Sequence, residues 1–598
     1  MSLEEPAAEY RQRLAQRKAD LAHAMARERI YGHVRLTVFL TGATLAWLFA
    51  GPKLLSPAWL ILPLLGFIVL MVGHSRTTRR REVLERAVSF YQEGLDRLAG
   101  TWPGRGDGGR RFSDPEHPYA RDLDLFGPDS LFALLNVTRT RTGEERLAGW
   151  LLSAAEPHVV RARQAAVEEL RSKLDLREDL AVLGADLAAS VDTETLAEWS
   201  RAPTVLTEPR LPWVAGFCSL FTVSMIVAWF VPAISTGGIP LLTALALQTV
   251  VARVYRGRAS TVIARVSHPA EELEVLATLL ARFEAEQFES PLLVSLRERL
   301  ITESRPPSER IASLGRLREM LDSRRNQLFA PVAAVLMWGT QFAAAIERWR
   351  SRYGAAVPVW LETVAQLESL SALAGYAYEH PGDPFPELVE KGPRFEGQGL
   401  GHPLLHSGCV DNDVRLNTDQ ALWIVSGSNM SGKSTFLRTI GVNAVLAQAG
   451  GPVRANRLTM SALAIGATLR VEDSLHKGAS RFYAEISRLR SLVSIADESP
   501  PALLFLLDEI LHGTNSHDRL IGAEAVVRGL LERGAIGLVT THDLALSKIA
   551  DELSPRAANV HFADHLENGE IRFDYLVREG VVRKSNALEL MRSIGLKV

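Results

Sequence analysis

The sequence of 598 residues has little cysteine, no excess of positive charge and no signal-peptide pattern at its start. Its two cysteines, Cys218 and Cys409, lie far apart, one in an apolar run and one ahead of a glycine-rich motif. This spacing argues against a disulfide and favours a reducing compartment. The formal net charge is −2, so the chain lacks the basic excess typical of a dedicated duplex-binding protein. We expect no signal peptide, because the first thirty or so residues are charged and helical in pattern.

Charge is missing altogether from a long stretch in the middle of the chain. Residues 211–252 hold no charged side chain and are broken only by the turn PAISTGGIP. An earlier pair of apolar segments covers residues 36–50 and 58–73. A helix of about 20 apolar residues can cross a bilayer. We therefore predict two transmembrane helical hairpins, at residues 34–75 and 211–252.

Arginines flank both predicted hairpins, whereas the connecting turns hold one charged residue, Lys53. The positive-inside rule then places the N-terminus, the helical core and the C-terminal region in the cytoplasm of a multi-pass protein of the cell membrane, with lipid as a partner. Tryptophans suited to the interfaces are Trp47, Trp59, Trp213 and Trp229. The alternative is two hairpins buried in a soluble core, although a core helix rarely runs so far without a polar face.

The remaining sequence is helical in its first two thirds and alternates short apolar runs with helices after residue 385. That alternation predicts an α/β domain with a largely parallel sheet. The fold class expected is thus a P-loop ATPase domain at the C-terminus, preceded by an all-α core with two transmembrane hairpins. The expected segments are 1–33 (N-terminal helix), 34–75 (hairpin), 76–118 (helix and linker), 119–210 (helical core), 211–252 (hairpin), 253–385 (helical core or lever) and 386–598 (ATPase domain).

The stretch ALWIVSGSNMSGKSTFLRTIG has the order strand, glycine-rich loop, helix and fits the pattern G-x-x-x-x-G-K-[ST]. Gly427 and Gly432 let the backbone wrap a phosphate, and the N–H groups at the helix start face the anion. Lys433 reaches the β- and γ-phosphates of ATP, and the Ser434 hydroxyl binds Mg²⁺. The candidate nucleotide-binding residues are Gly427, Ser428, Asn429, Met430, Ser431, Gly432, Lys433, Ser434 and Thr435.

Two later strands supply the other polar groups of such a site. PALLFLLDE ends in Asp508, a candidate Mg²⁺ ligand, and in Glu509, a candidate general base that polarises the attacking water. AIGLVTTH ends in His542, a candidate sensor of the γ-phosphate. ATP and Mg²⁺ are therefore the expected cofactors, and ATP hydrolysis to ADP and phosphate is the expected reaction.

These motifs resemble those of the MutS family, the mismatch-repair ATPases. Asn429 and Met430 ahead of the glycine are similar to that family's N-M-x-G-K-S-T loop, and DEILHGTNSHD is similar to its D-E-x-x-x-G-T segment. TTHDLAL is similar to its T-H switch, with Asp543 in place of the usual aromatic residue. The helical stretches near residues 129–154 and 360–377 resemble the start and the return of the family's helical core.

The resemblance implies further site residues and a homodimer. VEDSLHKGASRFYAEISRL looks like the family's signature, in which Gly478 and Ser480 would approach the nucleotide of the opposite protomer. Arg481 departs from the usual threonine there. In the closing segment, His561 falls where the family has a histidine that packs on adenine. Two protomers would then enclose two ATP molecules.

Other departures from the family bear on function. The sequence shows neither an N-terminal mismatch-reading domain nor a Phe-x-Glu wedge, and the second apolar hairpin falls inside the helical core. We therefore expect a membrane-anchored MutS-like ATPase that acts on DNA, with RTRTGEER and ERWRSRYG as stretches able to touch phosphate. Two alternatives remain: an ATP-gated membrane signalling or scaffold protein with no DNA role, and a transporter.

Overall fold

The computed structural model describes residues 4–51, 56–104, 108–190, 192–206, 208–231, 238–405, 408–470, 481–498, 500–511, 515–542, 544–567 and 570–582. The chain forms two compact units. The first unit comprises Met1–Val137, Glu144–Glu178 and Ser369–Val598, and the second comprises Thr138–Gly143 and Asp179–Glu368. The second unit is thus inserted into the first, and α6 (Leu174–Ser190) and α14 (Val357–Glu379) connect them along the chain.

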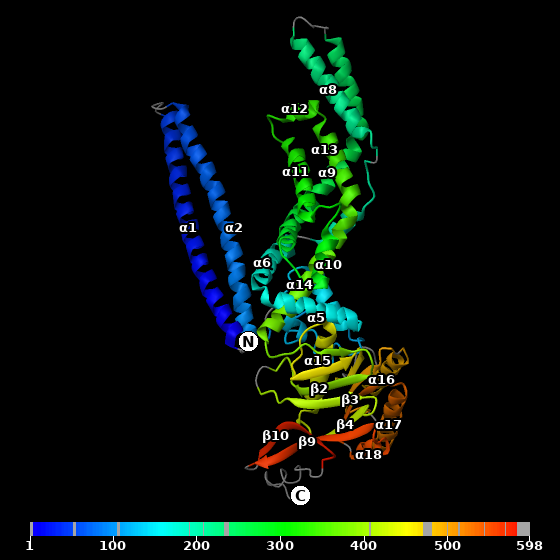
Figure 1. Ribbon diagram of the computed structural model, residues 1–598. Coiled ribbons are helices and arrows are strands. Elements are labelled where there is room, and N and C mark those ends of the chain that lie inside the picture. Colours follow the sequence, from blue (N-terminus) through cyan, green and yellow to red (C-terminus); the bar gives the residue numbers. More distant parts are fainter. Residues whose placement is uncertain are drawn as a thin grey trace. The chain divides into compact units, whose positions relative to one another are not determined.

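The first unit begins with a long helical hairpin, drawn in blue in Figure 1. Helix α1 (Glu4–Ala50) is continuous, so the expected N-terminal helix and the first apolar segment are one element; η1 (Pro57–Leu60) and α2 (Ile61–Leu98) follow. The apolar part of the hairpin is exposed, with Trp47 at 66%, Leu62 at 72% and Val69 at 70%. Its lower part is packed, because Tyr10 and Tyr91 are buried and their rings meet edge to face.

Short helices complete the helical part of the first unit. They are η2 (Arg110–Phe112), α3 (Leu131–Leu135), α4 (Arg141–Leu152) and α5 (Pro157–Ser172). Ser130 caps α3 by accepting a hydrogen bond from the Ala133 N–H group. Helix α5 packs against α15 (Lys433–Ala449). This contact fixes the helix that follows the glycine-rich loop.

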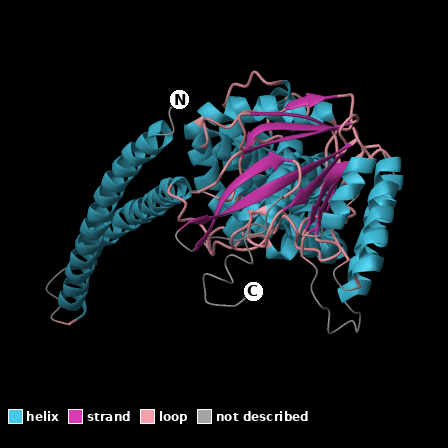
Figure 2. Ribbon diagram, turned by 90° about the horizontal axis from the view of Figure 1, so that it is seen from below, coloured by secondary structure: helices cyan, strands magenta, loops and turns pink. Residues whose placement is uncertain are grey.

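Two sheets form the C-terminal part of the first unit, and Figure 2 shows their strands between helices. One has the order β1-β5-β2-β3, from β1 (Glu387–Val389), β5 (Arg457–Ser461), β2 (Arg394–Leu400) and β3 (Asn412–Asn417). The other has the order β10-β9-β4-β8-β7-β6, from β10 (Glu570–Glu579), β9 (Ala557–Glu567), β4 (Leu422–Ser426), β8 (Ile536–Thr541), β7 (Leu503–Asp508) and β6 (Ala464–Thr468). The remaining helices are α16 (Arg481–Asp497), α17 (Ser516–Glu532) and α18 (Leu544–Glu552).

The six-stranded sheet is parallel except for β10, which pairs with β9 in the antiparallel sense. Every residue of β4 and β8 is buried, as are the first five of β7. Continuous apolar runs are typical of parallel strands covered on both faces. The predicted α/β sheet at the C-terminus is confirmed.

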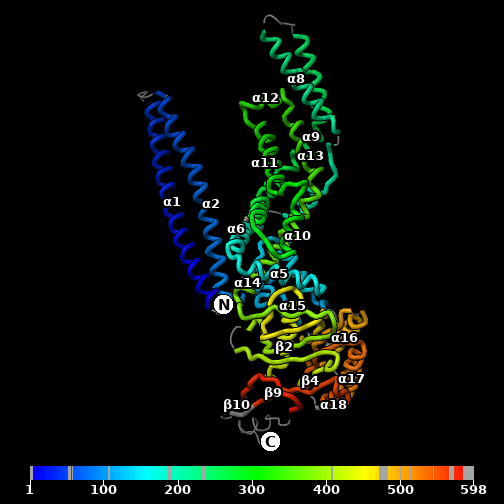
Figure 3. Tube along the Cα trace, viewed as in Figure 1, coloured from blue at the N-terminus to red at the C-terminus, as the bar shows by residue number. Residues whose placement is uncertain are grey.

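The second unit is helical. Its elements are α7 (Thr193–Arg201), α8 (Leu211–Phe230), α9 (Ile239–Glu284), α10 (Pro291–Leu300), α11 (Pro307–Ser323), α12 (Ala330–Val335), α13 (Trp338–Tyr353) and η4 (Gly354–Ala356). Helices α8 and α9 pack against each other, and α11 and α13 both pack on α9 (Figure 3). Thr222 of α8 and Gln248 of α9 are buried and joined by a hydrogen bond of 2.6 Å.

Three of the described helices are long and apolar enough to cross a membrane, namely α1, the segment Ala58–Leu98 and α8. In α1 and in Ala58–Leu98, none of the most apolar 18-residue window is buried. In α8, 33% of that window is buried. Trp213 and Phe230, near the two ends of α8, are 82% and 81% exposed. The apolar start of α9, which the sequence pairs with α8, is a shorter segment of a helix that continues to Glu284.

Candidate nucleotide-binding site

The glycine-rich loop connects the end of β4 to the start of α15, as predicted. Gly427 has φ 156° and Gly432, which caps α15, has φ 98°. A Cβ atom on Gly432 would lie 3.0 Å from the ring of Tyr575, and one on Gly427 would lie 2.7 Å from Ser431 Oγ. Glycine is therefore required at both positions, by backbone conformation and by space.

Lys433 is buried at the first position of α15, with 5% of its side chain exposed. Its Nζ donates hydrogen bonds of 2.9 Å to the carbonyl oxygens of Gly427 and Ser428. It also lies 3.4 Å from Glu509 Oε1. The lysine charge thus lies over the loop, where an incoming phosphate would meet it together with the N–H groups at the start of the helix.

Asp508 is the last residue of β7, and its carboxylate accepts hydrogen bonds from one residue of α15 and one residue of β8. Ser434 Oγ donates to Asp508 Oδ2 at 2.5 Å, and Thr540 Oγ1 of β8 donates to Asp508 Oδ1. The Glu509 N–H group in turn donates to Thr540 Oγ1 at 3.0 Å. Since β8 lies between β4 and β7, Thr540 connects the two acidic residues from the central strand. The role of this threonine was not predicted from the sequence.

Glu509 is held in a turn with φ 47°, a conformation unusual for a residue other than glycine. His542 follows β8, and its Nδ1 lies 3.5 Å from Glu509 Oε2. The structure therefore brings together Lys433, Ser434, Asp508, Glu509 and His542 from three strand ends. Asp543, the departure in the switch motif, lies outside the described residues.

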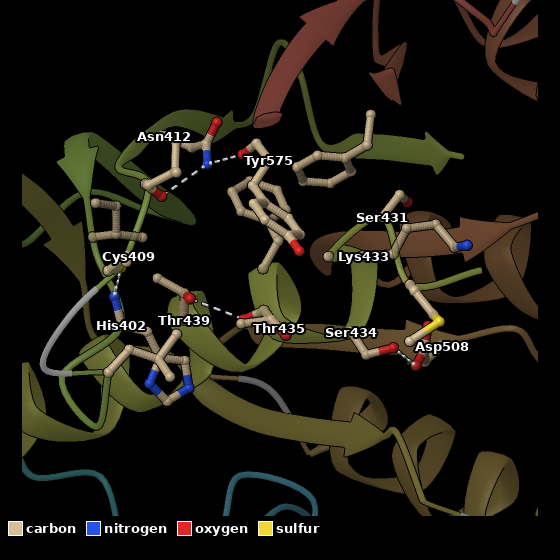
Figure 4. Close-up of a pocket in the computed structure, with 18 of the residues that line it drawn as sticks. His402, Cys409, Asn412, Ser431, Lys433, Ser434, Thr435, Thr439, Asp508 and Tyr575 are labelled. Atoms are coloured by element: carbon tan, nitrogen blue, oxygen red, sulfur yellow. Dashed lines mark hydrogen bonds between the residues drawn. The ribbon is translucent and has the colours of Figure 1, made fainter. Parts of the chain in front are cut away.

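A cavity of about 750 Å³ opens beside the loop. It is lined by Asn429–Phe436, Thr439, Asp508, Glu509, Phe562 and Tyr575, and by Leu400, His402, Leu405, Gly408, Cys409, Val410 and Asn412 from the chain between the end of β2 and the start of β3 (Figure 4). Ser431 Oγ is buried with no partner among the described residues. A nucleotide-sized space thus adjoins an unpaired hydroxyl, the lysine and the acidic residues.

His561 lies at the level of the loop but does not line this cavity in the described part of the chain. It is paired in register with Ser426, and its Nδ1 lies 3.0 Å from the Gly580 carbonyl oxygen. Adjacent side chains of a strand point to opposite faces, and the next residue, Phe562, lines the cavity. Contact of His561 with adenine stays a prediction.

Tyr575 and Asn412 form a wall that the sequence analysis did not foresee. The pairing of β10 with β9 shifts register between Phe573 and Val577, and Tyr575 has φ 56°. Asn412 Nδ2 donates to the Tyr575 carbonyl at 2.9 Å (Figure 4). Asn412 Oδ1 accepts from the Val577 N–H group at 2.7 Å. One amide from β3 therefore satisfies both irregular backbone groups and holds the tyrosine ring against Gly432.

His402 lines the cavity and is 6% exposed. Burial, together with the charges of Arg438 and Arg454, lowers the pKa of His402 to about 4. Its Nδ1 accepts a hydrogen bond from the Leu404 N–H group at 3.2 Å. Both observations describe a neutral imidazole.

The predicted signature residues Gly478 and Ser480 lie outside the described residues, within 471–480. The helix that follows them, α16, is described. Its Glu485 is 3% exposed and accepts a hydrogen bond from the Leu511 N–H group. The signature helix is therefore tied to the turn that carries Asp508 and Glu509.

The donor set suits Mg²⁺ bound together with phosphate rather than a metal held by protein alone. In the part of the chain that the structure describes, no three His, Cys, Asp or Glu side chains cluster to hold a metal ion. Ser434 Oγ and Asp508 Oδ2 are hard oxygen donors close to each other. Mg²⁺ usually takes one or two protein oxygens and completes its shell with phosphate and water, so these residues fit it.

The strand, glycine-rich loop and helix, with an acidic strand end beside them, define a P-loop nucleotide-binding domain. The family profile of MutS domain V matches residues 423–597. The C-terminal part of the chain is thus similar to MutS domain V, and the relatives described next are MutS proteins.

Curated relatives match the same region. DNA mismatch repair protein MutS 2 of Halobacterium salinarum is 35% identical over 243 residues, which are 40% of this chain and 28% of that protein. DNA mismatch repair proteins MutS of Shouchella clausii and Thermotoga maritima are 31% and 28% identical, over 39% and 40% of this chain and 27% and 30% of their own lengths. The matched region thus spans less than a third of each relative.

Proposed function

We propose that the chain is a membrane-anchored MutS-like ATPase that binds ATP with Mg²⁺ and hydrolyses it. One observation carries the proposal: the loop and helix after β4 and the end of β7 bring Lys433, Ser434, Asp508 and Glu509 to one cavity. These are the groups that phosphoryl transfer to water requires, namely a cation for the phosphates, oxygen ligands for a metal and a carboxylate for the nucleophile.

Each residue has a distinct task in this proposal. The loop N–H groups and Lys433 bind and orient the phosphates, and Ser434 and Asp508 would hold Mg²⁺. When bound, Mg²⁺ neutralises charge on the phosphate oxygens. Glu509 accepts a proton from the attacking water, and His542, 3.5 Å away, orients that carboxylate. Lys433→Ala weakens nucleotide binding, because it removes the buried cation of the site.

Glutamate-to-glutamine substitution tests the assignment. Glu509→Gln keeps the size and hydrogen-bonding reach of the side chain but cannot accept a proton, so we expect ATP binding to persist while kcat falls by about 10²- to 10⁴-fold. Glu498→Gln, an exposed change on the same domain, is the matched control. The measurements are phosphate release and equilibrium nucleotide binding by the full chain in detergent. Normal turnover by Glu509→Gln would show that the base is another group.

The dimeric arrangement is part of the proposal. Ser480 of each protomer would meet the nucleotide of the other, so that ATP favours the closed dimer through its differential affinity for the two states. A variant with Ser480→Ala should bind ATP normally and hydrolyse it slowly. Mixing it with a Lys433→Ala variant should restore one complete site per heterodimer. Full activity of a monomer would contradict this part of the proposal.

Membrane anchoring is supported by exposed apolar helices. Trp47, Trp59, Trp213 and Trp229, predicted to be interfacial, are all more than half exposed, and large exposed apolar surfaces on a soluble chain would promote aggregation. The test is extraction of membranes with alkaline carbonate, which releases peripheral proteins and leaves spanning ones in the pellet. Recovery of the chain in the supernatant would overturn the anchoring.

The names of the relatives suggest a first candidate function, in which the ATPase acts on DNA. The second candidate function is that of an ATP-gated membrane protein without a DNA role. The exposed apolar helices favour the second candidate, as does Arg350 of the stretch ERWRSRYG. This arginine is 6% exposed and donates hydrogen bonds to Glu347 and to the carbonyls of residues 199, 202 and 203, so it is not available to DNA. Salt-dependent duplex binding with stimulated ATPase activity supports DNA, and stimulation by lipid alone supports the second candidate.

A further inference from the structure

The second unit contains a cavity of about 690 Å³ at the foot of its apolar hairpin. Helix α9 contributes one face, the residues directly after α11 another and the start of α13 a third. Its lining residues are Thr249, Ala252, Arg253, Arg256, Ala259, Ser260, Ile263, Ala264, Ser267, Arg324, Arg325, Gly339 and Thr340. The described lining thus holds four arginines and several hydroxyl groups but no carboxylate.

Three of these arginines have no acidic partner among the described residues. Arg325 lies 3.8 Å from Asp322, whereas the structure gives no ion pair to Arg253, Arg256 or Arg324. Four positive charges around one cavity raise the local potential and attract an anion. Gly339 leaves room for one of them, because a Cβ atom there would lie 3.3 Å from Arg324 Nη1.

The cavity lies where the uncharged run of the hairpin ends. Arg253 directly follows residues 211–252, which carry no charge. Helix α12 lies at the same level, because Gln248 Nε2 donates to the carbonyl oxygens of Ala334 and Val335 at 2.8 Å and 3.0 Å. The uncharged part of the hairpin therefore ends at the level of the second unit where the arginines of the cavity begin.

Helix α12 belongs to a second uncharged stretch, residues 326–346, which directly follows Arg324 and Arg325. Leu328 is 91% exposed and Val332 is 47% exposed. These side chains are unfavourable in water but suit the boundary of a bilayer, where short apolar helices lie with arginines at the phosphate level. Each of the two uncharged stretches, residues 211–252 and 326–346, is thus directly next to arginines that line the cavity.

We propose that this cavity binds the phosphate of an anionic phospholipid headgroup, with Arg253, Arg256, Arg324 and Arg325 as its cations. Guanidinium groups form charge-assisted hydrogen bonds with phosphate oxygens, and basic pockets on the cytoplasmic side of spanning helices bind such headgroups. The proposal rests on the membrane anchoring proposed above. It makes the lipid a bound ligand of the second unit, not only a solvent for the hairpin.

The test compares two charge-matched double variants of the full chain in a non-ionic detergent. R256Q/R324Q removes one cation from each side of the cavity, and R299Q/R316Q removes two exposed arginines of the same unit that do not line it. Short-chain phosphatidylglycerol is titrated into each, with short-chain phosphatidylcholine and inorganic phosphate as competitors. A third variant, R253Q/R256Q, removes two exposed cations of the cavity that both lie on α9. Melting curves verify that each variant is folded.

We expect phosphatidylglycerol to bind the wild type and R299Q/R316Q alike, and to bind R256Q/R324Q about 30-fold more weakly. Phosphatidylcholine and inorganic phosphate should compete poorly. Equal affinity of all variants, or equally strong competition by inorganic phosphate, would overturn the headgroup assignment. Displacement of the lipid by a short DNA duplex would overturn it in favour of DNA. Failure of anchoring itself is distinguishable, because it releases every variant and the wild type from membranes in alkaline carbonate.

Discussion

Arg97 of α2 donates two hydrogen bonds to the carboxylate of Glu379, the last residue of α14, at 2.8 Å and 2.6 Å. The two side chains are 10% and 2% exposed. Tyr10 of α1 donates to the same carboxylate at 3.2 Å. Both helices of the N-terminal hairpin are thus attached to the residue that ends α14, shortly before β1 begins the first sheet. Through this carboxylate a movement of the hairpin would act on the helix that leads into the nucleotide-binding domain.

Arg97→Met should destabilise the first unit strongly. It leaves the Glu379 charge buried without its main partner, a change that typically costs about 3–5 kcal/mol. The double variant Arg97→Met/Glu379→Leu removes both charges and should recover much of the loss. Thermal unfolding of the full chain in detergent gives both results. A double variant as unstable as the single one would show that packing, rather than an unpaired charge, causes the loss.

The matched control is another arginine that pairs with a glutamate. Arg352 Nε lies 2.8 Å from Glu303 Oε1, but the two side chains are 62% and 43% exposed. Water screens such a pair, and its contribution to stability is small. Arg352→Met should leave the unfolding temperature almost unchanged. The contrast with Arg97 would then reflect burial and not the loss of an arginine as such.

Thr540→Val should slow ATP hydrolysis without abolishing nucleotide binding. Valine has the shape of threonine but lacks the hydroxyl that donates to Asp508 and accepts the Glu509 N–H group. Loss of a group that orients a metal ligand typically costs about 10- to 100-fold. The measurements are kcat and the Mg²⁺ concentration for half-maximal activity. Thr540→Ser, which keeps the hydroxyl, should stay close to the wild type, and equal defects in both would show a packing effect.

The sequence predicts those parts of the site that local pattern determines. The loop from Gly427 to Ser434 is contiguous, and its glycines, lysine and hydroxyl act through the backbone of one turn. Asp508 and His542 were predictable because the carboxyl ends of buried parallel strands meet at one edge of a sheet. The strands β4, β7 and β8 were each predictable as apolar runs, because parallel strands that are covered on both faces are apolar along their length.

Other features depend on contacts between distant segments and leave no local pattern. Asn412 and Tyr575 meet across 163 residues, so the residues next to each of them in the sequence do not indicate the contact. The side-chain direction of His561 depends on its strand register, which the sequence does not determine. Residues 326–346 lie in the part expected to be helical, but the division of this stretch into α12 and α13 was not predicted.

Asn412→Leu should weaken ATP binding more than it slows hydrolysis. The substitution removes both hydrogen bonds that hold the irregular segment around Tyr575, so the cavity wall beside Gly432 loses its fixed position. Lys433, Asp508 and Glu509 lie on other elements and are unchanged. We expect KM for ATP to rise by about tenfold, as loss of one or two hydrogen bonds implies, with kcat within a few-fold. A large fall in kcat with unchanged KM would contradict this division.

His402 should make the first unit less stable in acid. Its folded-state pKa of about 4 lies below the usual value of 6.5, so the unfolded chain binds the proton more readily. The stability that neutral His402 allows is complete above about pH 6.5 and is lost as pH falls towards 4, by up to ~3 kcal/mol. Protonation would also place a hydrogen on Nδ1. This atom could then no longer accept the hydrogen bond from the Leu404 N–H group. His402→Asn keeps an acceptor near that position and does not titrate, so its unfolding temperature should fall less steeply than that of the wild type between pH 6.5 and 4. Parallel profiles for the two proteins would show that other groups cause the acid sensitivity.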